Sequence, residues 1–398
     1  MSTFAKPQVK QRIQSIDILR GAIMLIMALD HTRDYLHHTA PGVDPTNIAT
    51  TTPILFFTRW ITHFCASNFV FLAGVSAFLA GIRRTKGELS AFLIKRGLWL
   101  ILVELIVMSF ALTFNPLFNE FVLQVIWAIG FSMILLGLLV RAPLTVIGII
   151  GGIIFFGHDV LDFLALPTAG PGFVLLKVFF TARGTVLPLG STHFLFDLYA
   201  VIPWTGVMFL GYVFGSLYGP TADPRKRKRV LLASGISLVM LFIVLRFINI
   251  YGDPAPWTVQ HNGVYTVLSF LDVSKYPPSL LFLCMTIGPG LIVLSLTENV
   301  QNKLTAIFIT YGNVPFFYYI LHFYLIRVIN IILFFASGYG VGQIKNPNGP
   351  FLFSPDGFGF SLGVVYLIWL FVIAALYWPC KWFGRYKKTH NQWWLSYL

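Results

Sequence analysis

The segment SIDILRGAIMLIMALDHTRDYLHH, residues 15–38, decides the fold of this chain. Its centre is a continuous apolar run, and charged residues or histidines stand at both ends. A helix advances 100° per residue, so the side chains that fall within about 40° of one line are Arg20, Met24, Met27, His31, Asp34 and His38. The segment therefore predicts a membrane-crossing helix with a polar stripe along one face.

The composition of the whole chain points to the same class of protein. Of the 398 residues, 57% are hydrophobic and 11% are charged, whereas a soluble domain carries about 25% charged residues. This excludes a soluble enzyme with a single anchor, a disordered chain, collagen and a coiled coil. The three cysteines lie far apart in apolar segments, so neither a disulfide framework nor a metal site is expected.

The predicted fold class is all-α, a polytopic membrane bundle of about ten transmembrane helices that forms a single domain over residues 1–398. Each crossing needs roughly 20 apolar residues. Residues 1–15 and 380–398 are expected outside the bilayer. The ten predicted spans cover about residues 17–36, 64–82, 92–114, 121–140, 144–157, 197–218, 230–250, 279–297, 306–336 and 361–379. Gly312, Asn313 and Pro315 are expected to break the ninth, which is too long for one straight crossing.

The positive charges predict the orientation. Most of the 28 Lys and Arg residues fall in alternate connections, including the run 225–229. By the positive-inside rule, both termini are cytoplasmic and the protein is a multi-pass protein of the plasma (inner) membrane. The formal charge of +13 is therefore explained by topology, and nucleic acid is not an expected partner.

The polar stripe of the first span predicts a site. Arg20 lies near the cytoplasmic end, and His31 lies about 16 Å further along the helix. Asp34 is one turn from His31, and we expect its carboxylate to hold the imidazole as a general base requires. Asp30 and Arg33 are spaced to pair with each other.

Further polar residues interrupt the other spans. His63 and Asn68 open the second span, and the hairpin between the first two spans is expected to bring them to one outer pocket with His31. His322 lies near mid-membrane. The sequence allows two roles for it equally well, as a residue that lines a cavity or as part of a hydrogen-bonded core. Lys275 is either an interfacial lysine or a cation at the outer mouth. For Glu104 we expect an ion pair with Arg20 or Arg96.

Several segments carry a family resemblance. The first is Ser15-Ile-Asp-Ile-Leu-Arg20-Gly21, which is followed by an apolar run to His31. This segment resembles the opening of polytopic membrane acyltransferases that O-acylate bacterial surface glycans. The remaining segments resemble the bacterial branch of the heparan-α-glucosaminide N-acetyltransferase catalytic-domain family. They are Phe69-Val-Phe-Leu-Ala-Gly74, Ile202-Pro-Trp-Thr-Gly206, Lys275-Tyr-Pro-Pro-Ser279, Gly312-Asn-Val-Pro315 and Tyr319-Ile-Leu-His322.

The resemblance implies a transmembrane acyltransferase. Such an enzyme passes an acetyl group from cytosolic acetyl-CoA to an amine or hydroxyl of a sugar or envelope glycan on the far side, without a metal. Arg20 would then meet the donor phosphates, and His31 or His63, with Asp34, would supply the base. Asn68, His322 and Lys275 would bind the acceptor. The lipid bilayer and a second copy of the chain complete the expected partners.

Two other functions remain open from the residues alone. Intramembrane His, Asp and Arg side chains also suit a transporter or permease for a small solute. A non-catalytic protein of envelope assembly is the third reading.

Overall fold

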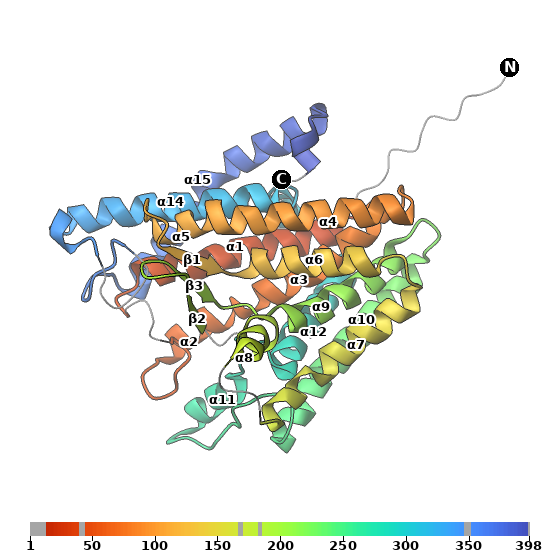
Figure 1. Cartoon of the computed structure of the whole chain (residues 1–398), viewed down its shortest axis with the longest axis horizontal. Helices are drawn as coiled ribbons and strands as arrows, with labels where there is room; N and C mark the ends of the chain where they lie inside the picture. The colour runs from red at the N-terminus through yellow and green to blue at the C-terminus, as the bar shows by residue number, and fades with distance from the viewer. Residues whose placement is uncertain (1–12, 40–43, 166–169, 182–184, 346–351, 397–398) are drawn as a thin grey trace.

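The computed structural model describes residues 13–39, 44–165, 170–181, 185–345 and 352–396. Within these residues the chain is mostly helical, with a small sheet toward one end of the bundle (Figure 1). The principal helices are α1 (Gln14–Leu36), α2 (Pro53–Trp60), α3 (His63–Gly81), α4 (Lys86–Val103), α5 (Ser109–Thr113), α6 (Val125–Leu139), α7 (Leu144–Gly157), α8 (Pro171–Leu176), α9 (Val201–Gly215), α10 (Pro224–Ile248), α11 (Gly263–Leu271), α12 (Leu280–Leu296), α13 (Lys303–Gly312), α14 (Pro315–Ala336) and α15 (Leu362–Thr389).

The helices make this a multi-pass membrane protein. Among the described residues, six helical stretches are long and apolar enough to cross a bilayer. They are Pro53–Gly81, Leu144–Phe163, Val201–Tyr218, Pro224–Ile248, Pro315–Ala336 and Leu362–Thr389. Apolar helices α6 and α12 are shorter. The count of about ten crossings and the cytoplasmic termini stay predictions, and residues 1–12 lie outside the described part of the chain.

A three-stranded sheet modifies the all-α prediction. Strand β3 (Phe194–Asp197) pairs in parallel with β1 (Glu120–Leu123) and antiparallel with β2 (Thr185–Pro188). Two predicted spans, 121–140 and 197–218, therefore begin too early, because a short apolar strand and the start of an apolar helix have the same hydrophobicity. The sheet and its following residues form a wall of the site described below.

Two glycines fix how α13 crosses α1. A Cβ atom on Gly21 would lie 1.8 Å from the carbonyl oxygen of Phe308, and one on Gly312 would lie 2.0 Å from that of Asp17. Only glycine allows the two backbones to approach so closely. The chain then breaks after Gly312 and restarts at Pro315, at the first helical position, where the missing N–H costs nothing. The predicted break in the ninth span is confirmed, and it sets the direction in which α14 runs beside α1.

The two ends of the bundle differ in charge. Figure 1 shows the α3–α4, α6–α7 and α9–α10 turns toward one end, and α2, α11 and the sheet toward the other. The first three turns, with the start of α10, carry Arg83, Arg84, Lys86, Arg141 and the run 225–229. We call this the basic end, and the opposite one the sheet end.

Candidate functional site

Two cavities lie along α1, and each takes its name here from one predicted site residue. The Arg20 pocket has a volume of about 310 Å³ and is built from α1, α3, α4, α6, the start of α14 and Lys387 of α15. The His31 pocket has a volume of about 230 Å³ and is built from α1, Arg59 of α2, the end of the sheet and the Lys275–Tyr276 loop. The polar stripe predicted for residues 15–38 therefore connects two separate cavities.

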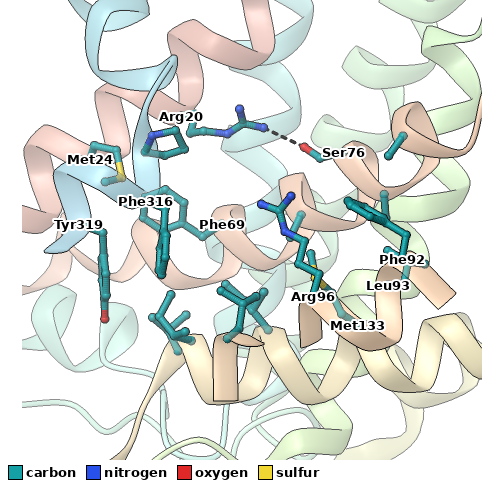
Figure 2. Close-up of a pocket in the computed structure, with 18 of the residues that line it drawn as sticks. Arg20, Met24, Phe69, Ser76, Phe92, Leu93, Arg96, Met133, Phe316 and Tyr319 are labelled. Atoms are coloured by element: carbon teal, nitrogen blue, oxygen red, sulfur yellow. Dashed lines mark hydrogen bonds between the residues drawn. The ribbon is translucent and has the colours of Figure 1, made fainter. Parts of the chain in front are cut away.

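The Arg20 pocket combines cations with an apolar wall (Figure 2). The Arg20 guanidinium donates to Ser76 Oγ at 2.9 Å and lies 3.6 Å from the Asp17 carboxylate. Arg96 and Lys387 line the same cavity. The apolar lining includes Met24, Phe69, Leu93, Leu100, Ile126, Ile129, Met133 and Phe316. Such a lining suits a ligand that has both an anionic and an apolar portion.

A buried ion network forms one side of the His31 pocket. Arg33 Nη2 donates to Asp30 Oδ1 at 2.9 Å, which confirms the predicted pair. Arg59 donates to the other Asp30 oxygen, and Arg33 also contacts Asp34. Asp30 thus joins α1 to α2. The Arg33 Nη1 atom is buried without a hydrogen-bond partner among the described residues, although the side chain lines the pocket.

His31 contacts another histidine. Its Nδ1 lies 2.7 Å from Nε2 of His322, and Nδ1 of His322 lies 3.0 Å from the carbonyl oxygen of Tyr318. The expectation that Asp34 holds the imidazole is therefore wrong: the Asp34 side chain is 47% exposed and contacts Arg33. The helical geometry allowed both arrangements, but Arg33 is the nearer cation and takes the carboxylate.

One turn of α14 separates the two pockets. His322 is fully buried between them and lines neither. Tyr319 lines the Arg20 pocket, whereas Phe323, one turn later, lines the His31 pocket. The ring centroids of Phe323 and His31 are 4.0 Å apart, and those of Tyr319 and His322 are 5.7 Å apart. We call these three α14 residues, together with His31, the partition.

The hairpin prediction for His63 and Asn68 is not supported, since neither residue lines either pocket. The His63 ring packs against Phe282 with centroids 5.4 Å apart. Asn68 Nδ2 donates to the carbonyl oxygens of Phe64 and Thr286, so it joins α3 to α12. The physical reason is the break between α2 and α3, which aims Arg59 at the pocket and His63 at α12.

Among the described residues, Glu104 forms no ion pair with Arg20 or Arg96, so the expected ion pair is wrong. It begins a π-helical turn, Glu104–Met108, and accepts a hydrogen bond from the backbone N–H of Gln124 at 2.5 Å. Gln124 follows β1 and lines the His31 pocket. This carboxylate therefore ties the sheet to the helix that follows α4.

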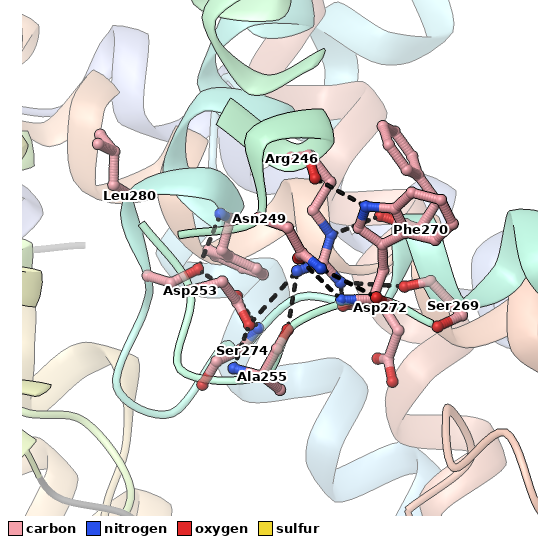
Figure 3. Close-up of polar contacts among 12 residues, drawn as sticks. Arg246, Asn249, Asp253, Ala255, Ser269, Phe270, Asp272, Ser274 and Leu280 are labelled. Atoms are coloured by element: carbon pink, nitrogen blue, oxygen red, sulfur yellow. Dashed lines mark hydrogen bonds and ion pairs between the residues drawn. The ribbon is translucent and has the colours of Figure 1, made fainter. Parts of the chain in front are cut away.

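Lys275 and Tyr276 stand on the loop that closes the sheet-end side of the His31 pocket. Arg246, at the end of α10, holds this loop from behind (Figure 3). Its guanidinium donates to four carbonyl oxygens, those of Phe270, Ala255, Ser269 and Asp272. Asp253 accepts from the Ser274 N–H at 2.8 Å and from Ser279 Oγ at 2.7 Å. The loop position is thus fixed at both of its ends.

Sequence reasoning missed Arg59, Arg96 and the partition aromatics. Arg59 could have been noticed as a rare cation in a connection otherwise poor in positive charge. The pairing of His31 with His322 had no such signal, because 291 positions separate them. Among the described residues, no group of three or more His, Cys, Asp and Glu side chains is placed to hold a metal ion.

The amino-acid sequence matches a known protein family. A model of the family described as "Heparan-alpha-glucosaminide N-acetyltransferase, catalytic" matches residues 12–250, which include Arg20, His31 and Arg59. No curated protein matches the sequence. The matched part covers more than half of the chain, from the start of α1 to the end of α10. The chain belongs to the heparan-α-glucosaminide N-acetyltransferase catalytic-domain family, a family of transmembrane acyltransferases.

Proposed function

We propose that this protein transfers an acetyl group from acetyl-CoA, bound in the Arg20 pocket, to an amine or hydroxyl of a sugar bound in the His31 pocket. One observation carries the proposal: the Arg20 pocket and the His31 pocket lie on either side of one turn of α14, and the partition between them contains His31, a histidine that lines the His31 pocket. A carbonyl carbon entering the partition from one side would come close to an acceptor on the other.

The Arg20 pocket is proposed as the donor site. Guanidinium groups bind phosphate oxygens through paired donors, and Arg20 is already oriented by Ser76. A cavity of about 310 Å³ holds the acyl-bearing end of the donor rather than the entire molecule. The nucleotide end would then extend toward the basic end of the bundle, which is the end that the positive-inside rule predicts to be cytoplasmic.

The His31 pocket is proposed as the acceptor site. His31 takes a proton from the acceptor hydroxyl or amine as the new bond to the acetyl carbon forms. The carbon–sulfur bond then breaks, the CoA thiolate leaves, and the imidazolium returns the proton to it. Arg33 and Lys275 line this pocket and are the proposed cations for acceptor oxygens.

The proposal places the protein in the inner membrane, with the acceptor site facing away from the cytoplasm. The concentration of basic turns at one end of the bundle supports this orientation. The acceptor would belong to the envelope, as a sugar or glycan. A homodimer stays a prediction of the sequence.

The test is acetyl transfer by the purified protein in nanodiscs with radiolabelled acetyl-CoA and an amino-sugar acceptor, following bound label and released CoA. Loss of a general base costs roughly 10²- to 10⁴-fold in rate. We expect His31→Gln to lose CoA release to that extent and still bind acetyl-CoA. His261→Gln, an exposed histidine on the sheet-end surface, is the matched control.

The competing functions give different results. Acetyl-CoA binding without CoA release under any acceptor would favour an assembly protein. Absence of both, together with solute uptake into proteoliposomes, would favour a transporter and refute the proposal.

A further inference from the structure

The hydrogen bonds around His322 determine which nitrogen of His31 is basic. A backbone carbonyl oxygen only accepts, so the 3.0 Å contact between His322 Nδ1 and Tyr318 O places a proton on that Nδ1. In a neutral imidazole the other nitrogen, Nε2, is then an acceptor. Since this Nε2 lies 2.7 Å from Nδ1 of His31, the His31 Nδ1 must be the donor.

His322 is neutral for a physical reason. It is fully buried, and its hydrogen bonds and ring contacts among the described residues are with Tyr318, Tyr319, His31 and Phe323, none of which carries a carboxylate. A buried charge without a counter-ion costs much more than a buried neutral ring. The chain of bonds therefore runs from His31 to His322 to the α14 backbone.

We propose that His322 is a positioning residue that holds His31 as the Nδ1–H tautomer and leaves Nε2 as the basic nitrogen in the His31 pocket. The inference rests on the proposed function and deepens it. It replaces two sequence-based roles, that of Asp34 as the group orienting His31 and that of His322 as an acceptor-binding residue.

The hydrogen bond between His31 and His322 also becomes stronger during the reaction. When Nε2 of His31 takes the acceptor proton, the ring becomes a cation, and its Nδ1–H bond to His322 becomes charge-assisted. Such bonds are roughly twice as strong as neutral ones. Because His322 only accepts from His31, no second proton needs to move.

The kinetic test compares two variants of His322. In His322→Gln the amide oxygen can accept from His31 and the amide N–H can donate to the Tyr318 carbonyl. In His322→Leu both bonds are lost at similar volume. We expect kcat to fall at least about 100-fold in the Leu variant, within the range for a mispositioned base, and to recover at least tenfold in the Gln variant. KM for acetyl-CoA should stay within about twofold, since His322 does not line the Arg20 pocket.

The second readout is independent of activity. Nitrogen-15 NMR of the histidine-labelled full chain in nanodiscs, with His31→Gln used to assign the signals, reports which His31 nitrogen carries the proton. The inference predicts protonated Nδ1 and unprotonated Nε2 in the wild type, and a tautomer mixture in His322→Leu. His261→Leu controls for the labelling background.

The outcomes separate the two levels of the argument. Protonated Nε2 in the wild type, or a Leu variant with undiminished kcat, overturns the positioning role. A Gln variant as poor as the Leu variant also overturns it. If the wild type shows the expected tautomer but never releases CoA, the proposed function fails and the tautomer assignment stands.

Discussion

Replacing Arg20 with alanine should weaken donor binding through the phosphates and through nothing else. The guanidinium lies in the Arg20 pocket, oriented by Ser76 at 2.9 Å. A hydrogen bond to a charged group contributes about 1.5–3 kcal/mol. Loss of one such contact therefore raises the dissociation constant of acetyl-CoA roughly 10- to 150-fold.

The assay measures equilibrium binding of two labelled ligands, acetyl-CoA and S-acetylpantetheine, which lacks the phosphates. Arg20→Ala should weaken the first and leave the second within about twofold. Ser76→Ala removes only the orienting acceptor, a contact of about 0.5–1.5 kcal/mol, so its effect on acetyl-CoA should be smaller. Arg141→Ala, an exposed arginine of the α6–α7 turn, is the charge-matched control. Equal losses for both ligands would refute the phosphate role, and so would an unchanged affinity for acetyl-CoA.

Three other predictions concern the structure that supports the site. Gly312→Ala places a Cβ 2.0 Å from a backbone oxygen of α1 and should destabilise the fold by about 1–3 kcal/mol. The control Gly152→Ala, with open space at its Cβ, should be neutral or stabilising. Equal unfolding midpoints for the two variants would contradict this. Arg246→Lys keeps the positive charge but loses the forked guanidinium that holds four carbonyl oxygens. The KM for the acceptor should therefore rise several-fold, while acetyl-CoA binding stays unchanged. A lower affinity for acetyl-CoA would count against a role confined to the Lys275 loop. Burial raises the pKa of Asp197, just before α9, to about 7, so its contribution to stability is complete below about pH 4 and declines as the pH rises toward 7, by up to about 1.4 kcal/mol per unit. Thermal unfolding between pH 5 and 8 should show this decline in the wild type and not in Asp197→Asn, and parallel curves for the two would exclude it.

Much of the helical architecture could be predicted, because apolar runs and helix breakers act locally. The break at Gly312 and Pro315 could be predicted because glycine and proline constrain the backbone locally, whatever the rest of the fold is. The strand at 120–123 could not be separated from the helix that follows it, since Phe121, Val122 and Leu123 are as apolar as the span beside them.

The site was predictable only along a single helix. Arg20, His31 and the Asp30–Arg33 pair share α1, where spacing gives the geometry directly. Which partner meets His31 depends on how α14 packs after its break, and which cation reaches Asp30 depends on the turn between α2 and α3. These are relations between distant segments, so spacing along the chain says nothing about them.

The partition has an electrical consequence. In the proposed function, the Arg20 pocket is entered from the cytoplasm and the His31 pocket from the opposite side. The membrane voltage would then fall mainly across the turn of α14 between Tyr319 and Phe323. One elementary charge crossing the full field exchanges about 2.3 kcal/mol per 100 mV. A proton that His31 returns to the departing thiolate would cross most of this field, whereas one released to the sheet-end side would cross almost none. The voltage dependence of the turnover rate in energised proteoliposomes would therefore report the direction in which the proton leaves.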